Sequence, residues 1–195
     1  MVNGGEKEQA MSNKHLRKVR SKYAHAYTLV EVLVTVTIIG IAGAMVAPSM
    51  GQAGVLKIQS AVRMVVSDIT FAQMDALGYQ EQRAIVFDID SNSYTLIQVN
   101  GNSIDVDADA LYDQKGPQQR YRINLDDPKY GGTVIESASF DGNSTLIFDE
   151  MGGPVSAPGT STLSDGGTII LAGPLSRWRI NIAAFTGRVT VTRLD

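Results

Sequence analysis

An uncharged segment from Val32 to Ala47 constrains this chain more than any other feature of its sequence. Glu31 stands directly before the segment, and Pro48 closes it. An ionisable side chain in a membrane helix costs about 2.5–3.5 kcal/mol on insertion scales, so such a residue is usually functional. A basic patch lies upstream and consists of Lys14, Arg17, Lys18, Arg20 and Lys22. This order predicts a membrane-inserted helix with a functional acid near its start.

The residues Ala26-Tyr27-Thr28-Leu29-Val30-Glu31 resemble the prepilin processing motif of type IV pilins and type II secretion pseudopilins. The resemblance implies cleavage between Ala26 and Tyr27 by the prepilin peptidase on the cytoplasmic side, followed by N-methylation of Tyr27. The family prefers Gly before the cut and Phe after it, whereas this chain has Ala26 and Tyr27.

The same resemblance implies residues for filament assembly. Glu31 becomes the fifth residue of the mature chain, the position of the family's glutamate. Pro48 falls where pilins carry a proline that kinks the N-terminal helix. Thr28 and Leu29 complete the predicted assembly segment, and we expect Thr28 to cap the helix.

Two simpler interpretations share the basic-then-apolar order. A signal anchor has it, with its orientation set by the flanking positive charges. A secretory signal is the other, because Ala42-Gly43-Ala44 has the small-residue form of a cleavage site. Neither interpretation gives Glu31 a role.

Composition excludes several kinds of catalytic site. The chain has no cysteine, and both histidines, His15 and His25, lie in the predicted leader. The mature chain would therefore lack Ser-His-Asp and Cys-His catalysis and the usual zinc ligands. Of 17 Lys/Arg and 20 Asp/Glu, the leader holds six and two, which leaves a mature net charge of −7. A generally basic nucleic-acid surface is not expected.

The remaining sequence predicts an α+β fold, in which a long N-terminal helix packs against antiparallel β-sheet. Apolar residues recur at helical spacing, and Gly78 is the predicted stop. These residues are Ile58, Val62, Val65, Ile69, Ala72 and Ala76. Strands are predicted at 84–89, 94–99, 121–123, 133–135, 145–148, 168–171, 178–182 and 188–192, with loops at 100–118 and 151–167. The predicted domains are a leader (1–26), a transmembrane and filament-core helix segment (27–50) and a periplasmic domain (51–195).

A second resemblance lies in the C-terminal half. Phe148-Asp149-Glu150-Met151-Gly152-Gly153 and Phe185-Thr186-Gly187-Arg188-Val189 resemble the minor pseudopilin branch called GspH or FimT. The alternative for Thr186-Gly187-Arg188 is a hairpin turn that needs a residue with positive φ.

Three groups of residues have side chains that could carry chemistry. Asp105, Asp107, Asp109 and Asp113 resemble a metal cluster, but the sixth and twelfth places of a calcium loop hold Ala110 and Gly116 instead of Gly and Glu. We expect a solvated acidic loop and no metal or cofactor. Glu81, Glu136 and Glu150 have no spacing that supports a glycosidase pair, so we do not expect an enzyme.

The third constellation is Arg177, Arg179, Arg188 and Arg193 beside Trp178. Arginines next to an aromatic ring grip phosphates or stack a base, and some FimT-like proteins use an Arg-rich C-terminal region in DNA uptake. Here Thr190, not arginine, lies two residues beyond Arg188. An ordinary exposed strand face is the alternative.

The sequence therefore predicts a minor pilin or pseudopilin subunit near a filament tip. The expected partners are other pilin-like subunits, the prepilin peptidase and methylase, the inner-membrane assembly platform and a secreted cargo protein. The expected location is the inner membrane, with the N-terminus cytoplasmic and the C-terminal domain periplasmic, and then the filament. The alternatives are a DNA-binding minor pilin and an anchored or secreted β domain without a filament role.

Overall fold

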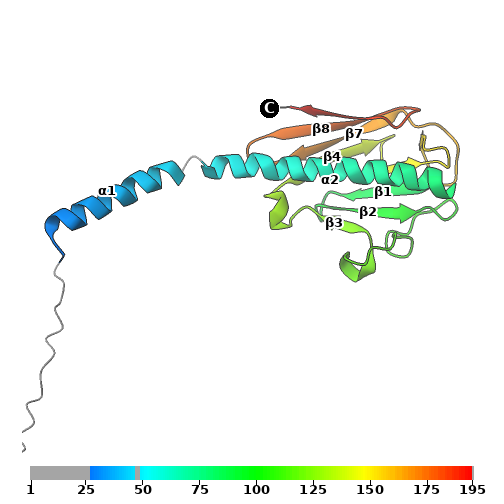
Figure 1. Ribbon diagram of the computed structural model, residues 1–195. Coiled ribbons are helices and arrows are strands. Elements are labelled where there is room, and N and C mark those ends of the chain that lie inside the picture. Colours follow the sequence, from blue (N-terminus) through cyan, green and yellow to red (C-terminus); the bar gives the residue numbers. More distant parts are fainter. Residues whose placement is uncertain (1–26, 47–48, 195) are drawn as a thin grey trace, which may run out of the picture. The chain divides into compact units, whose positions relative to one another are not determined.

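The computed structural model describes residues 27–46 and 49–194, with the side chains of 27–44 and 56–194 (Figure 1). The chain divides into two compact units, residues 1–44 and 45–195. The helices are α1 (Leu29–Val46) and α2 (Ser49–Tyr79), with short 3-10 helices at Pro117–Gln119 and Pro128–Tyr130. The strands are β1 (Arg83–Asp88), β2 (Ser93–Gln98), β3 (Arg122–Asn124), β4 (Val134–Phe140), β5 (Thr145–Phe148), β6 (Pro154–Val155), β7 (Gly166–Ala172), β8 (Arg177–Ala183) and β9 (Val189–Arg193).

One stripe of α2 forms the centre of the second unit. Its six predicted core residues are all buried, with exposures from 0 to 5%. Full burial of a Val or Ile side chain contributes about 1.5–3 kcal/mol. The stripe packs against the inner faces of two antiparallel sheets, which lie on either side of α2 in Figure 1. The predicted α+β architecture is confirmed.

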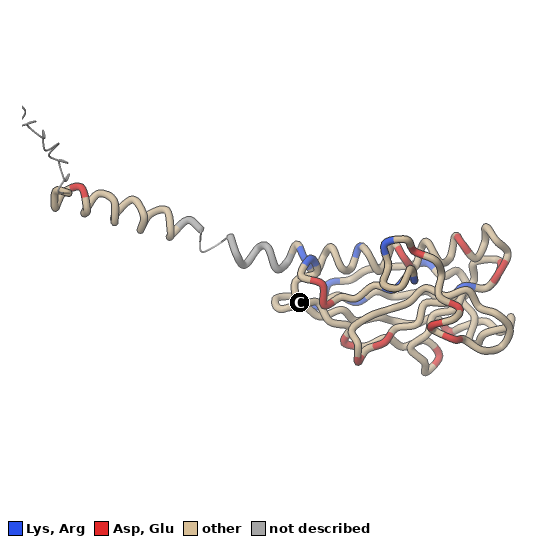
Figure 2. The backbone as a smooth tube through the Cα atoms, turned by 90° about the horizontal axis from the view of Figure 1, so that it is seen from below, with Lys and Arg blue, Asp and Glu red and all other residues tan. Residues whose placement is uncertain are grey.

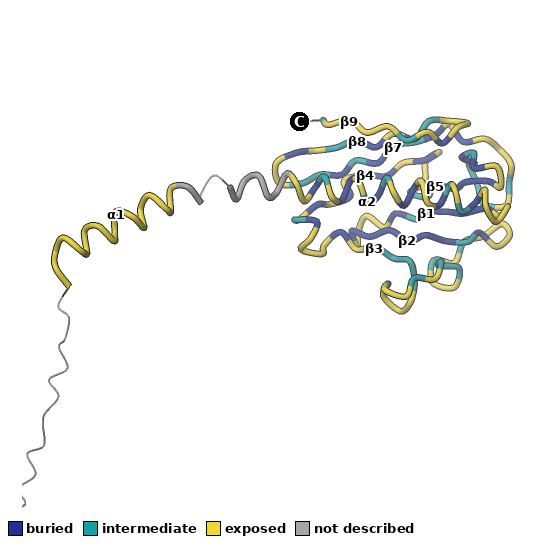
Figure 3. The backbone as a smooth tube through the Cα atoms, viewed as in Figure 1, coloured by how far each residue is buried: buried dark blue, intermediate teal, exposed yellow. Residues whose placement is uncertain are grey.

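The two sheets have the strand orders β3-β2-β1-β5-β6 and β4-β7-β8-β9. In the first sheet Ile85 of β1 lies opposite both Leu96 and Leu146, and all three side chains are buried. In the second sheet Ile169 lies opposite Ile180. Alternate residues on each strand therefore face α2, and Figure 3 shows the resulting buried stretches.

The predicted acidic loop covers the other face of the first sheet. Its Ile104 and Val106 pack on a small second core that contains Ala84, Ile97 and Ile147. The acidic residues of the loop remain at the surface or half-buried. The loop is thus a lid on an apolar sheet face.

Some predicted boundaries are wrong. The helix does not stop at Gly78 but continues to Tyr79, and Gln80 takes the left-handed conformation at φ 54°. The amide of Glu81 donates to the carbonyl of Ala76 at 3.2 Å, the long bond of a Schellman cap. β4 extends to Phe140, and β6 lies within the predicted 151–167 loop.

Asn92 joins the two sheets. It lies in the β1–β2 turn with φ 48°, and its side chain is buried. Its Oδ1 accepts from the amide of Ile135 at 2.9 Å, and its Nδ2 donates to the carbonyl of Thr133 at 2.9 Å. The amide side chain therefore pairs with the start of β4 as a neighbouring strand would.

The two segments of the C-terminal resemblance meet beside α2. Gln73 Nε2 donates to the carbonyl of Gly152 at 2.7 Å and to that of Thr186 at 3.0 Å. The carboxylate of Asp149 accepts from the amides of Met151 and Gly153 at 3.0 and 2.7 Å. One helix side chain thus fixes both turns, which are more than 30 residues apart.

Asp68 is the one charged residue of the α2 core face that is almost fully buried, at 2% exposure, among the described residues. The hydroxyl of Tyr94 donates to its carboxylate at 2.6 Å, and that of Tyr121 at 2.9 Å. Burial raises the pKa of Asp68 above its ordinary 3.8, while the two hydrogen bonds act to lower it. The ionised form is therefore less favourable here than in the unfolded chain.

A pH dependence of stability follows from Asp68. A raised folded-state pKa contributes stability that is fully present below the unfolded pKa and is lost as pH rises through the folded pKa. We expect Asp68→Asn to remove the part of the stability loss that develops above pH 3.8. Thermal unfolding of the full chain in detergent, measured across this range, checks the prediction. An unchanged slope with Asp68→Asn would contradict it.

The junction at Gly187 gives a second prediction. Gly187 has φ 64°, and a Cβ there would lie 2.7 Å from Gln73 Nε2 and 2.9 Å from Phe148 Cε1. Gly187→Ala should cost about 1–2 kcal/mol for the backbone and about 1–3 kcal/mol more for overpacking. Gly142→Ala is the matched control, because Gly142 also has positive φ (85°) but open space at Cβ. Denaturant unfolding should show a larger loss of unfolding free energy for Gly187→Ala than for Gly142→Ala. Equal losses would mean that the junction is not closely packed.

Candidate functional site

The predicted assembly segment begins α1. Thr28 caps the helix, as predicted, because its Oγ1 accepts from the amide of Glu31 at 3.1 Å. Glu31 therefore occupies the third helical position, where the helix dipole favours a negative charge. Tyr27, Leu29 and Glu31 are exposed. Ala26 and Pro48 lie outside the described residues, so cleavage after Ala26 and a kink at Pro48 stay predictions.

The surface of α1 is apolar on all sides. Leu29, Val30, Leu33, Val36 and Ile39 are each more than 60% exposed. Figure 3 shows the described helix as exposed throughout, and Figure 2 shows a single acidic position, near its start. A helix that is apolar all round is normally covered by protein or lipid.

The threonines of α1 do not add free polar groups. The hydroxyl of Thr35 donates to the carbonyl of Val32 at 2.9 Å, and that of Thr37 to the carbonyl of Leu33 at 2.7 Å. Glu31 is the only charged side chain on the described part of α1. Across the described residues, no helix combines the length and apolar character needed to cross a membrane.

The four candidate arginines do not form one patch. Arg177 and Arg179 leave β8 on the face away from α2 and are exposed. Arg193 lies opposite Trp178 in the β8–β9 register, so its side chain leaves the other face of the sheet. Arg188 lies by the β8–β9 turn, five residues from Arg193 along the hairpin, about 16 Å at strand spacing.

Arg177 already has a partner within the domain. Its Nε donates to Glu136 Oε2 at 2.8 Å, and its Nη2 contacts Glu136 Oε1. A carboxylate therefore balances the charge of this arginine. This arrangement fits an ordinary strand face better than a phosphate-binding surface.

The acidic loop engages its carboxylates locally. Asp105 accepts from the amides of Asp107 and Ala108 at 2.9 and 3.0 Å, and these bonds lower its pKa. Asp107 pairs with Arg120 at 2.7 Å and with Arg122 at 3.2 Å. Within the described parts of the chain, no three acidic, His or Cys side chains are placed to hold a metal ion.

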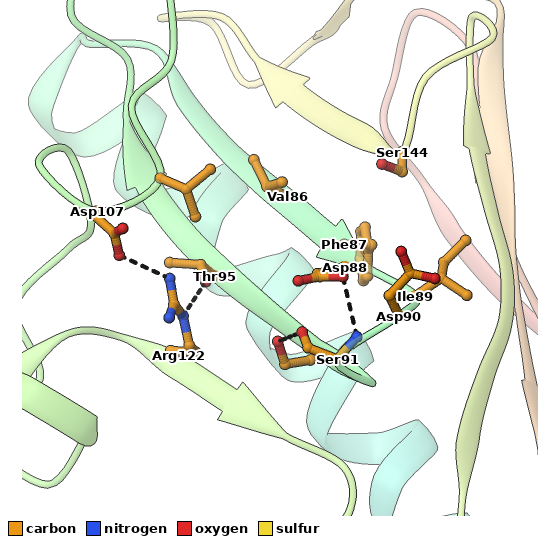
Figure 4. A pocket seen from close by; sticks show the side chains of 12 residues that line it. Val86, Phe87, Asp88, Ile89, Asp90, Ser91, Thr95, Asp107, Arg122 and Ser144 are labelled. Atoms are coloured by element: carbon orange, nitrogen blue, oxygen red, sulfur yellow. Dashed lines mark hydrogen bonds and ion pairs between the residues drawn. The ribbon is translucent and has the colours of Figure 1, made fainter.

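Figure 4 shows an open, polar pocket of about 640 Å³ on the outer side of the first sheet. Arg122 lies at one end, bonded to Thr95 Oγ1 at 3.0 Å and to Asp107. Asp88 lies toward the other end and accepts from the amide of Ser91 at 3.2 Å. Hydrogen bonds from Ser91 lower the pKa of Asp88. These polar groups are held by neighbours and provide no paired nucleophile and base.

The three glutamates that could form a glycosidase pair lie in separate places in the structure. Glu81 contacts Arg83 at 3.0 Å and Gln98 at 2.9 Å, whereas Glu136 binds Arg177. Glu150 is exposed beside the Asp149 turn. The structure does not bring these three side chains to one bond-cleaving site.

Comparison with known proteins points to the N-terminal segment. Residues 21–47 match the prokaryotic N-terminal methylation motif. No curated protein matches the chain. Among solved structures, the chain is similar to the minor pseudopilin EpsH from the type 2 secretion system of Vibrio cholerae, with 10% identity and a TM-score of 0.48 over 70% of this chain and 97% of that chain. The match to the N-terminal methylation motif covers the same segment that resembles a prepilin processing motif in the sequence.

Proposed function

We propose that this chain is a minor subunit of a type II secretion pseudopilus or a type IV pilus, of the GspH/FimT-like branch. The observation that carries the proposal is α1, whose apolar surface is exposed on all sides and carries one acid at its start. The role is structural, as in the family, and requires no catalysis. The methylation motif over residues 21–47 supports it independently.

The surface of α1 requires two successive environments. Contiguous apolar surface of this extent marks an interaction with protein or membrane. Before assembly, the helix is covered by lipid of the inner membrane, with the C-terminal domain in the periplasm. After assembly, neighbouring N-terminal helices replace the lipid, and close packing and polar contacts between helices then hold the filament.

Glu31 selects the position of the incoming subunit. A carboxylate in a low-dielectric setting is tolerated only when it is paired or neutralised. Cleavage at Ala26 would create a positive amine on Tyr27, and Glu31 of one subunit would pair with the Tyr27 amine of its neighbour. Because the charge is unfavourable elsewhere in the bilayer, this pair sets the axial register of the subunit.

The C-terminal junction supports the GspH/FimT-like branch. The two segments that resemble this branch are joined by Gln73, so they form one structural unit instead of two separate turns. A position near the filament tip, contact with a secreted cargo protein and contact with the assembly platform follow from the branch. DNA binding is not favoured, because the candidate arginines lie on different faces and ends of the hairpin.

Processing gives the first prediction of this function. The mature protein should begin at Tyr27 with an N-methyl group, because the peptidase acts between the basic leader and the apolar helix. Mass spectrometry of the purified mature chain checks this. A mature chain that begins at Met45, after Ala42-Gly43-Ala44, would instead identify a secretory signal.

The role of Glu31 gives the second. Breaking a buried charge pair costs about 3–5 kcal/mol, so Glu31→Gln and Glu31→Leu should reduce crosslinking between neighbouring subunits by about tenfold or more. Glu31→Asp should be intermediate, because it keeps the charge but shortens its reach. Membrane insertion and the folded domain should be unchanged.

Thr37→Val is the matched control for the loss of a polar side chain in the same helix. The Thr37 hydroxyl bonds only to its own helix among the described residues, so this variant should crosslink like the parent. If Glu31→Leu also crosslinks like the parent, the register mechanism is wrong.

A further inference from the structure

β9 presents an open edge. It is the last strand of its sheet and pairs only with β8 among the described strands (Figure 1). The amide of Leu194 donates to the carbonyl of Arg177 at 2.8 Å, and that of Ala183 to the carbonyl of Arg188 at 3.0 Å. Hydrogen-bonded pairs alternate along an antiparallel ladder. The backbone groups of Val189, Val191 and Arg193 therefore point away from β8.

The opposite edge of the same sheet is closed at its start. There Asn92 occupies the amide of Ile135 and the carbonyl of Thr133, as described above. β9 has no equivalent cover in the described part of the chain. Unpaired strand edges are templates for another strand unless charges, proline or bulges protect them. The Val-Thr-Val-Thr sequence of β9 contains none of these before Arg193.

An apolar groove of about 490 Å³ lies beside this edge, between α2 and the β8–β9 hairpin. Val62 and Val66 of α2 line one side, and Trp178 and Val191 line the other. Val191 is 41% exposed, although its strand neighbour Ile180 is fully buried. A strand added to β9 would place alternate side chains over this groove.

The charges at the groove are basic. Arg63 lines it, and Arg193 leaves the same sheet face as Trp178. Neither guanidinium has an ion-pair partner within residues 27–46 and 49–194. A carboxylate on the occupant would complement both arginines.

Charge also distinguishes between the segments that could occupy the groove. The leader carries six basic and two acidic residues, so the groove would repel it. A second copy that paired β9 with β9 would bring two sets of Arg63 and Arg193 into one interface, and like charges across such a pair are unfavourable. The complementary occupant is a different, acidic chain.

We propose that β9 and the adjoining groove bind an extended segment of a different protein. The segment adds as a strand to the β9 edge, places apolar side chains in the groove, and directs a carboxylate to Arg63 and Arg193. Main-chain pairing gives such contacts affinity, and alternate side chains give them specificity. The surface lies within the second unit, residues 45–195.

Trp178 is the only tryptophan of the chain and reports directly on the groove. The test titrates the full chain in detergent with a synthetic peptide that alternates valine and threonine and carries aspartate at its last valine position. We expect a saturable change in Trp178 fluorescence. A matched peptide with lysine in place of aspartate should bind at least about tenfold more weakly.

Variants of β9 separate edge pairing from charge. Val191→Pro removes an amide that faces the open edge, a position where proline is tolerated, and should abolish binding. Arg193→Glu should weaken binding of the aspartate peptide at least about tenfold. Arg179→Glu, on the opposite face of the sheet, should leave this binding unchanged. Thermal unfolding verifies that each variant is folded. If Val191→Pro does not fold, the comparison of Arg193→Glu with Arg179→Glu decides the test.

Three outcomes would overturn the proposal. One is no saturable change up to roughly 1 mM peptide, the weak limit of specific binding. Another is equal binding of the lysine and aspartate peptides. The third is a Trp178 change that depends on protein concentration without peptide, which would identify a second copy of this chain as the occupant.

Discussion

The second unit depends on the contact that α2 makes with the inner faces of both sheets. The stripe from Ile58 to Ala76 supplies one buried surface to both sheets at once. Because both sheets pack on the same helix face, α2 helps to fix where both lie. Asn92 and Gln73 then lock the sheets and turns with directed hydrogen bonds. Burial supplies most of the stability, and these polar contacts specify a single arrangement.

The same physics separates α1 from α2. α2 has one apolar face and buries it within its own domain, whereas α1 is apolar on all sides and its described side chains remain exposed. Water disfavours such a surface, so α1 requires lipid or other helices. Glu31 is the exception on this surface and is positioned by the Thr28 cap. A helix with an apolar surface on all sides can associate strongly with lipid or other helices, and its single charge can still set a defined register.

The domain treats its polar groups in two ways. Most are satisfied internally: Asp149 by turn amides, Asp107 by arginines and Asp68 by two tyrosines. The edge of β9 and the guanidiniums of Arg63 and Arg193 differ, since the described residues offer them no partner. Their position beside an apolar groove distinguishes this face from the polar pocket of Figure 4, whose arginine is already paired.

The sequence by itself determined the features that depend on near neighbours. The residues from Ala26 to Glu31 and the apolar segment after them predicted the N-terminal methylation motif, and the spacing from Ile58 to Ala76 predicted the core face of α2. Both follow from the local order and spacing of residues along the chain, which the sequence shows directly. Only the tertiary structure decided that Gln73 joins two distant turns, that the acidic loop covers a sheet, and that Arg193 and Arg179 leave opposite faces. These depend on strand register and on contacts between residues far apart in sequence, and a shift of one residue in register exchanges the two faces of a strand.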